Sequence, residues 1–127
     1  MPCVYSLFPA LLYMGLIYWM SAHPVPETLK TWPMLWQVKL VHILEYGLLA
    51  LLWLWGLTRA GLASGRRAAV TCILITFLWG VSDEIHQHFV PGRTARLADA
   101  LTDLLAAVLA LGVYALFRSL RNHGAKA

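Results

Sequence analysis

Charged residues are scarce in this sequence. Only 13% of its 127 residues are Asp, Glu, Lys or Arg, whereas 60% are apolar. The mean hydropathy of +0.66 lies outside the range that is usual for soluble proteins. A water-soluble fold cannot hide so much apolar surface, so the composition excludes a soluble protein. The length allows a single domain, which we expect to occupy residues 1–127.

The long apolar runs lack the period-two alternation of membrane β-strands. Because backbone polar groups must be paired within a bilayer, only a helix bundle or a closed barrel can cross it. We therefore predict an all-α fold, an integral membrane bundle of four transmembrane helices. Their expected bounds are about 4–20, 40–58, 68–89 and 99–118. The Pro- and Trp-rich segment 21–37 is expected to lie as a loop at the membrane surface.

The basic residues fall unevenly on the two sides of the predicted bundle. If both termini are cytoplasmic, six of the ten Lys and Arg residues lie inside and four lie outside. The positive-inside rule favours this orientation, which makes the chain a multi-pass protein with both termini in the cytoplasm. The net charge of +4 is then a consequence of topology, and no nucleic-acid partner is expected.

Three acidic residues are predicted to share one height in the membrane. Glu45, Asp83 and Asp103 each lie 14 to 16 residues from an arginine at the inner end of their own helix. At a rise of about 1.5 Å per residue, that places them about 21 to 24 Å from the inner boundary, within the outer leaflet. Ionisable groups at such a depth are costly, so a cluster of them is a functional hypothesis by default.

Helical spacing gathers further polar residues around these acids. The positions that share a helix face are Lys39, His42 and Tyr46; Asp83 and Gln87; Glu84 and His88; and Asp99 and Asp103. We expect the three helices to turn these faces toward one another.

The sequence also lacks the common signatures of catalysis and metal binding. It contains no G-x-S-x-G nucleophile motif, no H-E-x-x-H motif and no closely spaced pair of cysteines. Glu84 and His88 have the i, i+4 spacing that can place two metal ligands together, but nothing else supports a metal. We predict neither a metal nor another cofactor.

The polar residues resemble the signature of the VanZ-like membrane protein family. The run SDEIHQHFVPGR at residues 82–93, followed by Asp99, is similar to the family pattern D-E-x-x-Q-x-F-x-P-x-R with a later Asp. Lys39, His42 and Tyr46 match its K-x-x-H-x-x-x-Y pattern, and Ser21 matches a serine at the end of the first helix. The chain departs from the pattern in having Asp103 where relatives usually have Asn, and an Ala near position 106 where they have Gly.

This resemblance implies a compact bundle of four membrane helices in the inner membrane of bacteria, with a role at the cell envelope. It also implies a link to glycopeptide resistance, because the family takes its name from a protein connected with low-level resistance to teicoplanin. The expected partners are membrane lipids, including a lipid-linked cell-wall precursor.

Two functional readings and two alternatives remain open from the sequence. The first is recognition of an anionic lipid or lipid-linked precursor, with Lys39, Arg93 and Arg96 meeting phosphate. The expected binding residues are Lys39, His42, Tyr46, Asp83, Glu84, Gln87, Arg93, Asp99 and Asp103. The second is a membrane enzyme, in which Asp83 or Glu84 acts as general base with His42 or His86 as its partner. The alternatives are ion pairs that only stabilise the bundle and a non-catalytic assembly helper.

The last expectation concerns Arg93, which follows Pro91 and Gly92. These two residues favour a turn that folds the loop back over the helix ends. We expect Arg93, Asp83 and Asp99 to form one charge-coupled group at the outer mouth of the bundle.

Overall fold

The computed structural model describes residues 3–24, 32–91, 93 and 95–124, and for residues 32–38 it describes the backbone alone. A short 3-10 helix, η1 (Val4–Leu7), leads into α1 (Phe8–Ser21). Three longer helices follow: α2 (Trp32–Arg59), α3 (Gly65–His88) and α4 (Leu97–Gly124). Four segments are long and apolar enough to cross a membrane, namely Val4–Ser21, Lys39–Arg59, Gly65–His88 and Leu97–Gly124. The predicted four-helix membrane bundle is confirmed.

Two helices are longer than their apolar runs indicated. α2 begins at Trp32, so the expectation of a loop over 21–37 is wrong for residues 32–37, while residues 25–31 lie outside the described part of the chain. Pro33 is compatible with this start because the first amide groups of a helix have no intrahelical partner. α4 continues to Gly124 instead of ending near 118. The Pro- and Trp-rich composition of residues 32–37 suggested a surface loop, and the polar residues from 118 on suggested a helix end, but neither feature stops a helix.

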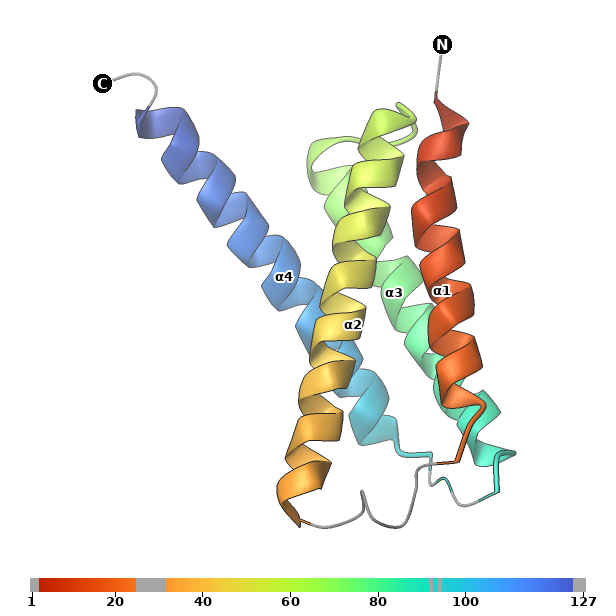
Figure 1. The fold of residues 1–127 in the computed structure, drawn as a ribbon. Helices are drawn as coiled ribbons and strands as arrows, with labels where there is room; N and C mark the ends of the chain where they lie inside the picture. The colour runs from red at the N-terminus through yellow and green to blue at the C-terminus, as the bar shows by residue number, and fades with distance from the viewer. Residues whose placement is uncertain (1–2, 25–31, 92, 94, 125–127) are drawn as a thin grey trace.

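The core lies where α2 packs against each of the other three helices (Figure 1). Small residues permit these close approaches. A Cβ atom on Gly47 in α2 would lie 3.4 Å from the Cβ of Ala110 in α4. A Cβ atom on Gly56 would lie 2.8 Å from the backbone oxygen of Ser6, whose hydroxyl donates a hydrogen bond to the Gly56 carbonyl. These contacts bring η1 and α4 against α2.

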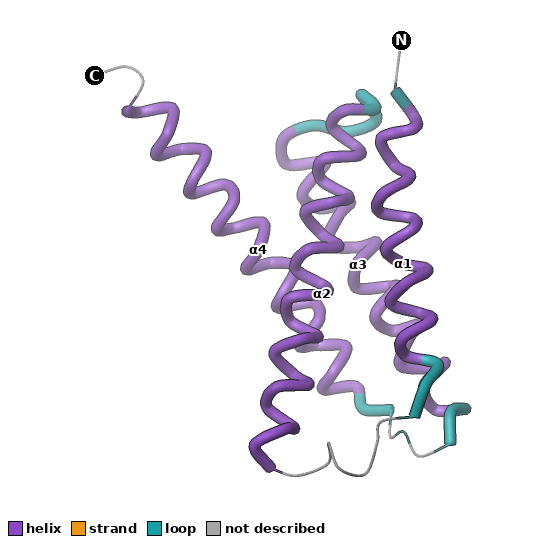
Figure 2. The backbone as a smooth tube through the Cα atoms, viewed as in Figure 1, coloured by secondary structure: helices purple, strands orange, loops and turns teal. Residues whose placement is uncertain are grey.

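The order of the helices defines two ends of the bundle. α1 and α3 end, and α2 and α4 begin, at one end, which we call the distal end (Figures 1 and 2). The start of η1, the end of α4 and the turn between α2 and α3 lie at the opposite end. The second half of α4 leaves the other helices in Figure 1, and residues 112–124 are all exposed. Their apolar side chains suit contact with lipid.

Candidate functional site

Buried polar side chains concentrate at the distal end, and most of them come from one turn of α3. Asp83, Glu84 and Gln87 are all buried, as is Asp103 in α4. Successive residues of a helix point about 100° apart, so Asp83 and Glu84 necessarily face different neighbours. As a result, the predicted cluster divides into three sets of contacts.

The first set joins α1 to α3, and we call it the α1–α3 relay. The hydroxyl of Ser21, the last residue of α1, donates a hydrogen bond to Oδ1 of Asp83. The side-chain amide of Gln87 donates to Oδ2 of the same carboxylate at 2.7 Å. Arg93 donates through Nη1 to Oε1 of Gln87 at 3.3 Å. The relay consists of Ser21, Asp83, Gln87 and Arg93.

Arg93 also bonds to the end of α1. Its Nε and Nη2 donate to the backbone oxygen of His23 at 3.0 and 2.9 Å, and Nη2 donates to that of Met20 at 3.4 Å. The last carbonyl groups of a helix lack intrahelical donors and carry partial negative charge, which favours a cation there. Arg93 therefore holds the end of α1 against α3.

The expected direct contact of Arg93 with two carboxylates is not present. Among the described residues, no ion pair joins Arg93 to Asp83 or Asp99. Gln87 stands between Arg93 and Asp83, and the arginine is turned toward the carbonyl groups of α1. The turn after Pro91 was expected to fold the loop back over the ends of α3 and α4, but Arg93 bonds instead to acceptors at the end of α1.

The second set joins α2, α3 and α4, and we call it the central polar junction: His42, Tyr46, Gly80 and Asp103. Nδ1 of His42 lies 3.8 Å from Oδ1 of Asp103. The rings of His42 and Tyr46 are stacked, with centroids 6.2 Å apart. A Cβ atom on Gly80 would lie 3.1 Å from Oδ2 of Asp103 and 3.3 Å from Cε1 of Tyr46. Gly80 thus lets both side chains approach the backbone of α3.

The junction contains polar atoms that make no hydrogen bond within the described structure. Nδ1 of His42, the Tyr46 hydroxyl and Oδ1 of Asp103 are buried without a partner. The 3.8 Å separation of His42 and Asp103 exceeds hydrogen-bond length. These groups retain capacity for further polar contacts, because buried polar atoms are normally paired with protein or water.

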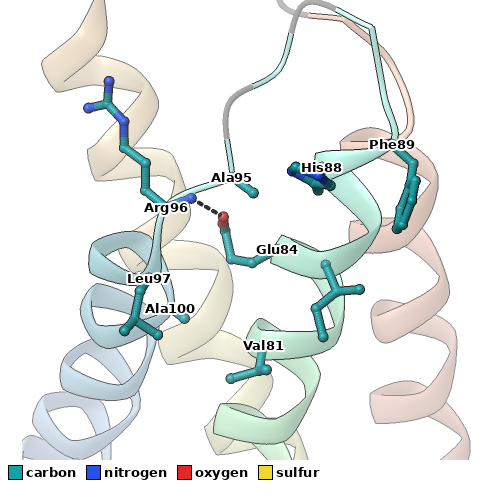
Figure 3. A pocket seen from close by; sticks show the side chains of 9 residues that line it. Val81, Glu84, His88, Phe89, Ala95, Arg96, Leu97 and Ala100 are labelled. Atoms are coloured by element: carbon teal, nitrogen blue, oxygen red, sulfur yellow. Dashed lines mark hydrogen bonds between the residues drawn. The ribbon is translucent and has the colours of Figure 1, made fainter.

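The third set lies between α3 and α4, where an open groove has a volume of about 330 Å³. Figure 3 shows the carboxylate of Glu84 directed at the backbone nitrogen of Arg96, which donates to Oε2 at 2.8 Å. Ile85, Phe89 and Leu97 beside it are largely exposed, so the groove opens toward the surroundings of the bundle. We call this cavity the α3–α4 groove. It is lined by Val81, Glu84, Ile85, His88, Phe89, Ala95, Arg96, Leu97 and Ala100.

The four candidate catalytic residues are divided among three interfaces: Asp83 and His86 contact α1, Glu84 faces the α3–α4 groove, and His42 lies between α2 and α4. His86 stacks on Tyr18 of α1, with ring centroids 4.3 Å apart. Among the described residues, neither Asp83 nor Glu84 pairs with His42 or His86; the His–carboxylate contact there is His42 with Asp103. Within the same part of the chain, no three His, Cys, Asp or Glu side chains lie together in a way that could hold a metal ion. The geometry offers binding surfaces more readily than an assembled acid–base pair.

The remaining predicted residues lie at the edges of these sets. Lys39 is exposed on α2, and Asp99 is half-buried in the first turn of α4. The sequence interpretation missed Gly80 as the residue that makes room for Asp103. A glycine inside an apolar helix signals close approach of a neighbour, and Gly80 stands one turn before Asp83 on α3.

Comparison with known proteins adds one relationship. A family model described as VanZ/LLP1 matches residues 6–118, which is most of the chain. No curated protein and no solved structure matches the chain.

Proposed function

The chain belongs to the VanZ/LLP1 family, and on that premise we propose that it recognises an anionic lipid or a lipid-linked cell-wall precursor at the bacterial cell envelope. Membrane-spanning helices give it direct access to such molecules. An amphiphile requires an apolar surface for its chain and polar groups for its headgroup, side by side.

The observation that carries this proposal is the meeting of these two surfaces at the distal end. The α3–α4 groove has apolar walls formed by Val81, Ile85 and Leu97. The polar residues Glu84, His88 and Arg96 line the same cavity. Arginine is well suited to phosphate because its planar guanidinium can donate two parallel hydrogen bonds.

The proposal places the distal end in the outer leaflet of the inner membrane, with both termini in the cytoplasm. The distribution of Lys and Arg supports this orientation. In that position the site faces lipids of the outer leaflet, which include precursors that have already crossed the membrane. We also propose that the protein lowers sensitivity to teicoplanin, and the family resemblance supports this second claim.

The test begins with the lipids that copurify with the protein in mild detergent. We expect enrichment of anionic lipids or of polyprenyl-linked precursors over their share in the membrane, and loss of that enrichment in a variant with an altered site. A lipid profile identical to the bulk membrane would contradict the proposal. Chemical turnover of the enriched lipid would instead identify the protein as an enzyme.

A growth experiment tests the claim about teicoplanin. Expression of the intact protein is expected to raise the teicoplanin concentration that inhibits growth, and an equally abundant Glu84→Gln variant, which alters the α3–α4 groove, is expected to raise it less. Unchanged sensitivity with the intact protein would remove teicoplanin from the proposal and leave lipid recognition to the copurification test.

A further inference from the structure

The two arginines at the distal end have different surroundings. We propose that Arg96, and not Arg93, binds the anionic headgroup, while the α3–α4 groove takes one hydrocarbon chain of the same lipid. This assignment rests on the proposed function and names the residue that determines its selectivity.

The guanidinium of Arg93 is already hydrogen-bonded within the protein. Its Nε, Nη1 and Nη2 all donate hydrogen bonds, to the side chain of Gln87 and to the backbone oxygens of Met20 and His23. A phosphate would have to displace these acceptors, and the end of α1 would lose its attachment to α3. Arg93 is therefore a structural residue of the α1–α3 relay.

Arg96 has the opposite arrangement. Its backbone nitrogen is fixed by Glu84, but within the described part of the chain its guanidinium makes no hydrogen bond and no ion pair. The residue is exposed, and Figure 3 shows its side chain extending away from the groove and from Glu84. Because this long side chain is exposed and unbonded there, it is free to hold a headgroup beside the mouth of the groove while a chain of the same lipid lies between α3 and α4.

The position of Arg96 is set by the fold. Its backbone oxygen accepts a hydrogen bond from the amide of Asp99 at 2.8 Å in the first turn of α4. The Glu84 carboxylate accepts from its amide nitrogen at 2.8 Å. Glu84 is thus a positioning residue that fixes the backbone from which the guanidinium extends, and α4 contributes the positive end of its dipole at the same place.

The groove limits what can accompany the headgroup. A volume of about 330 Å³ is small for a ligand site, and its apolar lining offers no partner for a second polar group apart from Glu84, His88 and Arg96. It suits one acyl or prenyl chain, with any further chain remaining in the bilayer. Free phosphate has no hydrocarbon chain to bury in the groove, so it is expected to bind more weakly than a lipid.

Native mass spectrometry of the full chain tests the assignment with phosphatidylglycerol as the anionic probe and phosphatidylcholine as the zwitterionic one. Four proteins are compared: wild type, Arg96→Gln, Arg93→Gln and Arg121→Gln, the last altering an exposed arginine at the far end of α4. The melting temperature of each protein is also measured without additive, with phosphatidylglycerol and with inorganic phosphate alone.

We expect wild type and Arg121→Gln to prefer phosphatidylglycerol equally. Arg96→Gln is expected to weaken that binding about tenfold, which corresponds to one lost charge-assisted contact, without lowering the melting temperature. Arg93→Gln is expected to melt lower while the folded fraction keeps its preference. Inorganic phosphate is expected to leave all four melting temperatures unchanged.

The failures are distinguishable. No preference for phosphatidylglycerol in wild type would overturn the proposed function itself. A preference that survives in Arg96→Gln, or one that disappears in folded Arg93→Gln, would overturn the assignment of Arg96 and leave lipid recognition standing. Stabilisation by phosphate as large as that by lipid would overturn the role of the groove.

Discussion

The hydroxyl of Ser21 donates a hydrogen bond to the carboxylate of Asp83, and so joins the last residue of α1 to a buried acid in α3. The two residues are 62 positions apart in the chain. A buried carboxylate is costly unless donors surround it, and Asp83 receives one from Ser21 and one from Gln87. This contact explains why α1, which has few other polar groups, ends at the polar layer.

Replacing Ser21 with Ala is expected to lower the free energy of unfolding by about 1 to 3 kcal/mol, because a buried charged acceptor loses a donor. Thr102→Ala is the control, since its exposed hydroxyl bonds within its own helix to the oxygen of Ala98. Reversible unfolding in mixed micelles measures both. Equal losses in the two variants would show that the Ser21 contact adds no stability.

The replacement of Arg93 with Lys is expected to destabilise the protein by about 1 to 3 kcal/mol. An ammonium group cannot reach the acceptors on Gln87, Met20 and His23 with the same planar geometry. Combining Arg93→Met with Gln87→Leu should cost less than the sum of the single changes, because the two residues contact each other.

The double-mutant cycle of Arg93→Met with Asp99→Asn is expected to show additive losses in the free energy of unfolding, since no ion pair joins these two described residues. Unfolding measurements on the single and double variants decide both cycles. Coupling with Asp99 but none with Gln87 would restore the arrangement expected from the sequence.

Gly80→Ala is expected to destabilise the bundle by about 1 to 3 kcal/mol. The added Cβ would lie 3.1 Å from Oδ2 of Asp103 and 3.3 Å from Cε1 of Tyr46, so these buried side chains would have to shift away from α3. Gly112→Ala provides the control, because no atom lies within 4 Å of a Cβ there. Alanine should stabilise that helix position slightly. Similar melting temperatures for the two variants would mean that Gly80 is not under packing constraint.

The fold follows from the sequence to a large extent. Apolar run lengths predict four membrane helices because no soluble fold could bury so many apolar residues, and the structure contains those helices. The helix ends were harder to predict: α2 starts at Trp32, a start that Pro33 permits because Pro costs little in the first turn of a helix. Hydropathy carries no signal for such turns.

The candidate site was predictable in its composition and less so in its contacts. Spacing correctly placed Asp83 and Gln87 on one face, where they are hydrogen-bonded. It could not reveal that Arg93 bonds to backbone carbonyl groups at the end of α1, because every residue type has a backbone carbonyl and the sequence does not show which one is used. The α3–α4 groove depends on how two helices diverge, which a single helical pattern does not specify.

Membrane orientation has its own test. A reporter fused at residue 63, in the turn between α2 and α3, is expected to be active in the cytoplasm, because Arg59, Arg66 and Arg67 flank that turn. A fusion after residue 124 should behave in the same way, since the two positions lie at the same end of the bundle. Reporter activity outside the cytoplasm at residue 63 would invert the orientation and move the distal end to the inner leaflet.

Photo-crosslinking tests the central claim most directly, with an anionic phospholipid that carries a diazirine on one acyl chain and the full-length protein in a bilayer. We predict labelled peptides from residues 81–89 and 95–100, and loss of that label when unlabelled anionic lipid competes but not when phosphatidylcholine does. Label spread evenly over exposed apolar residues, including Leu11 and Leu12 on α1, and insensitive to competition would contradict the claim that this protein holds a lipid in the α3–α4 groove.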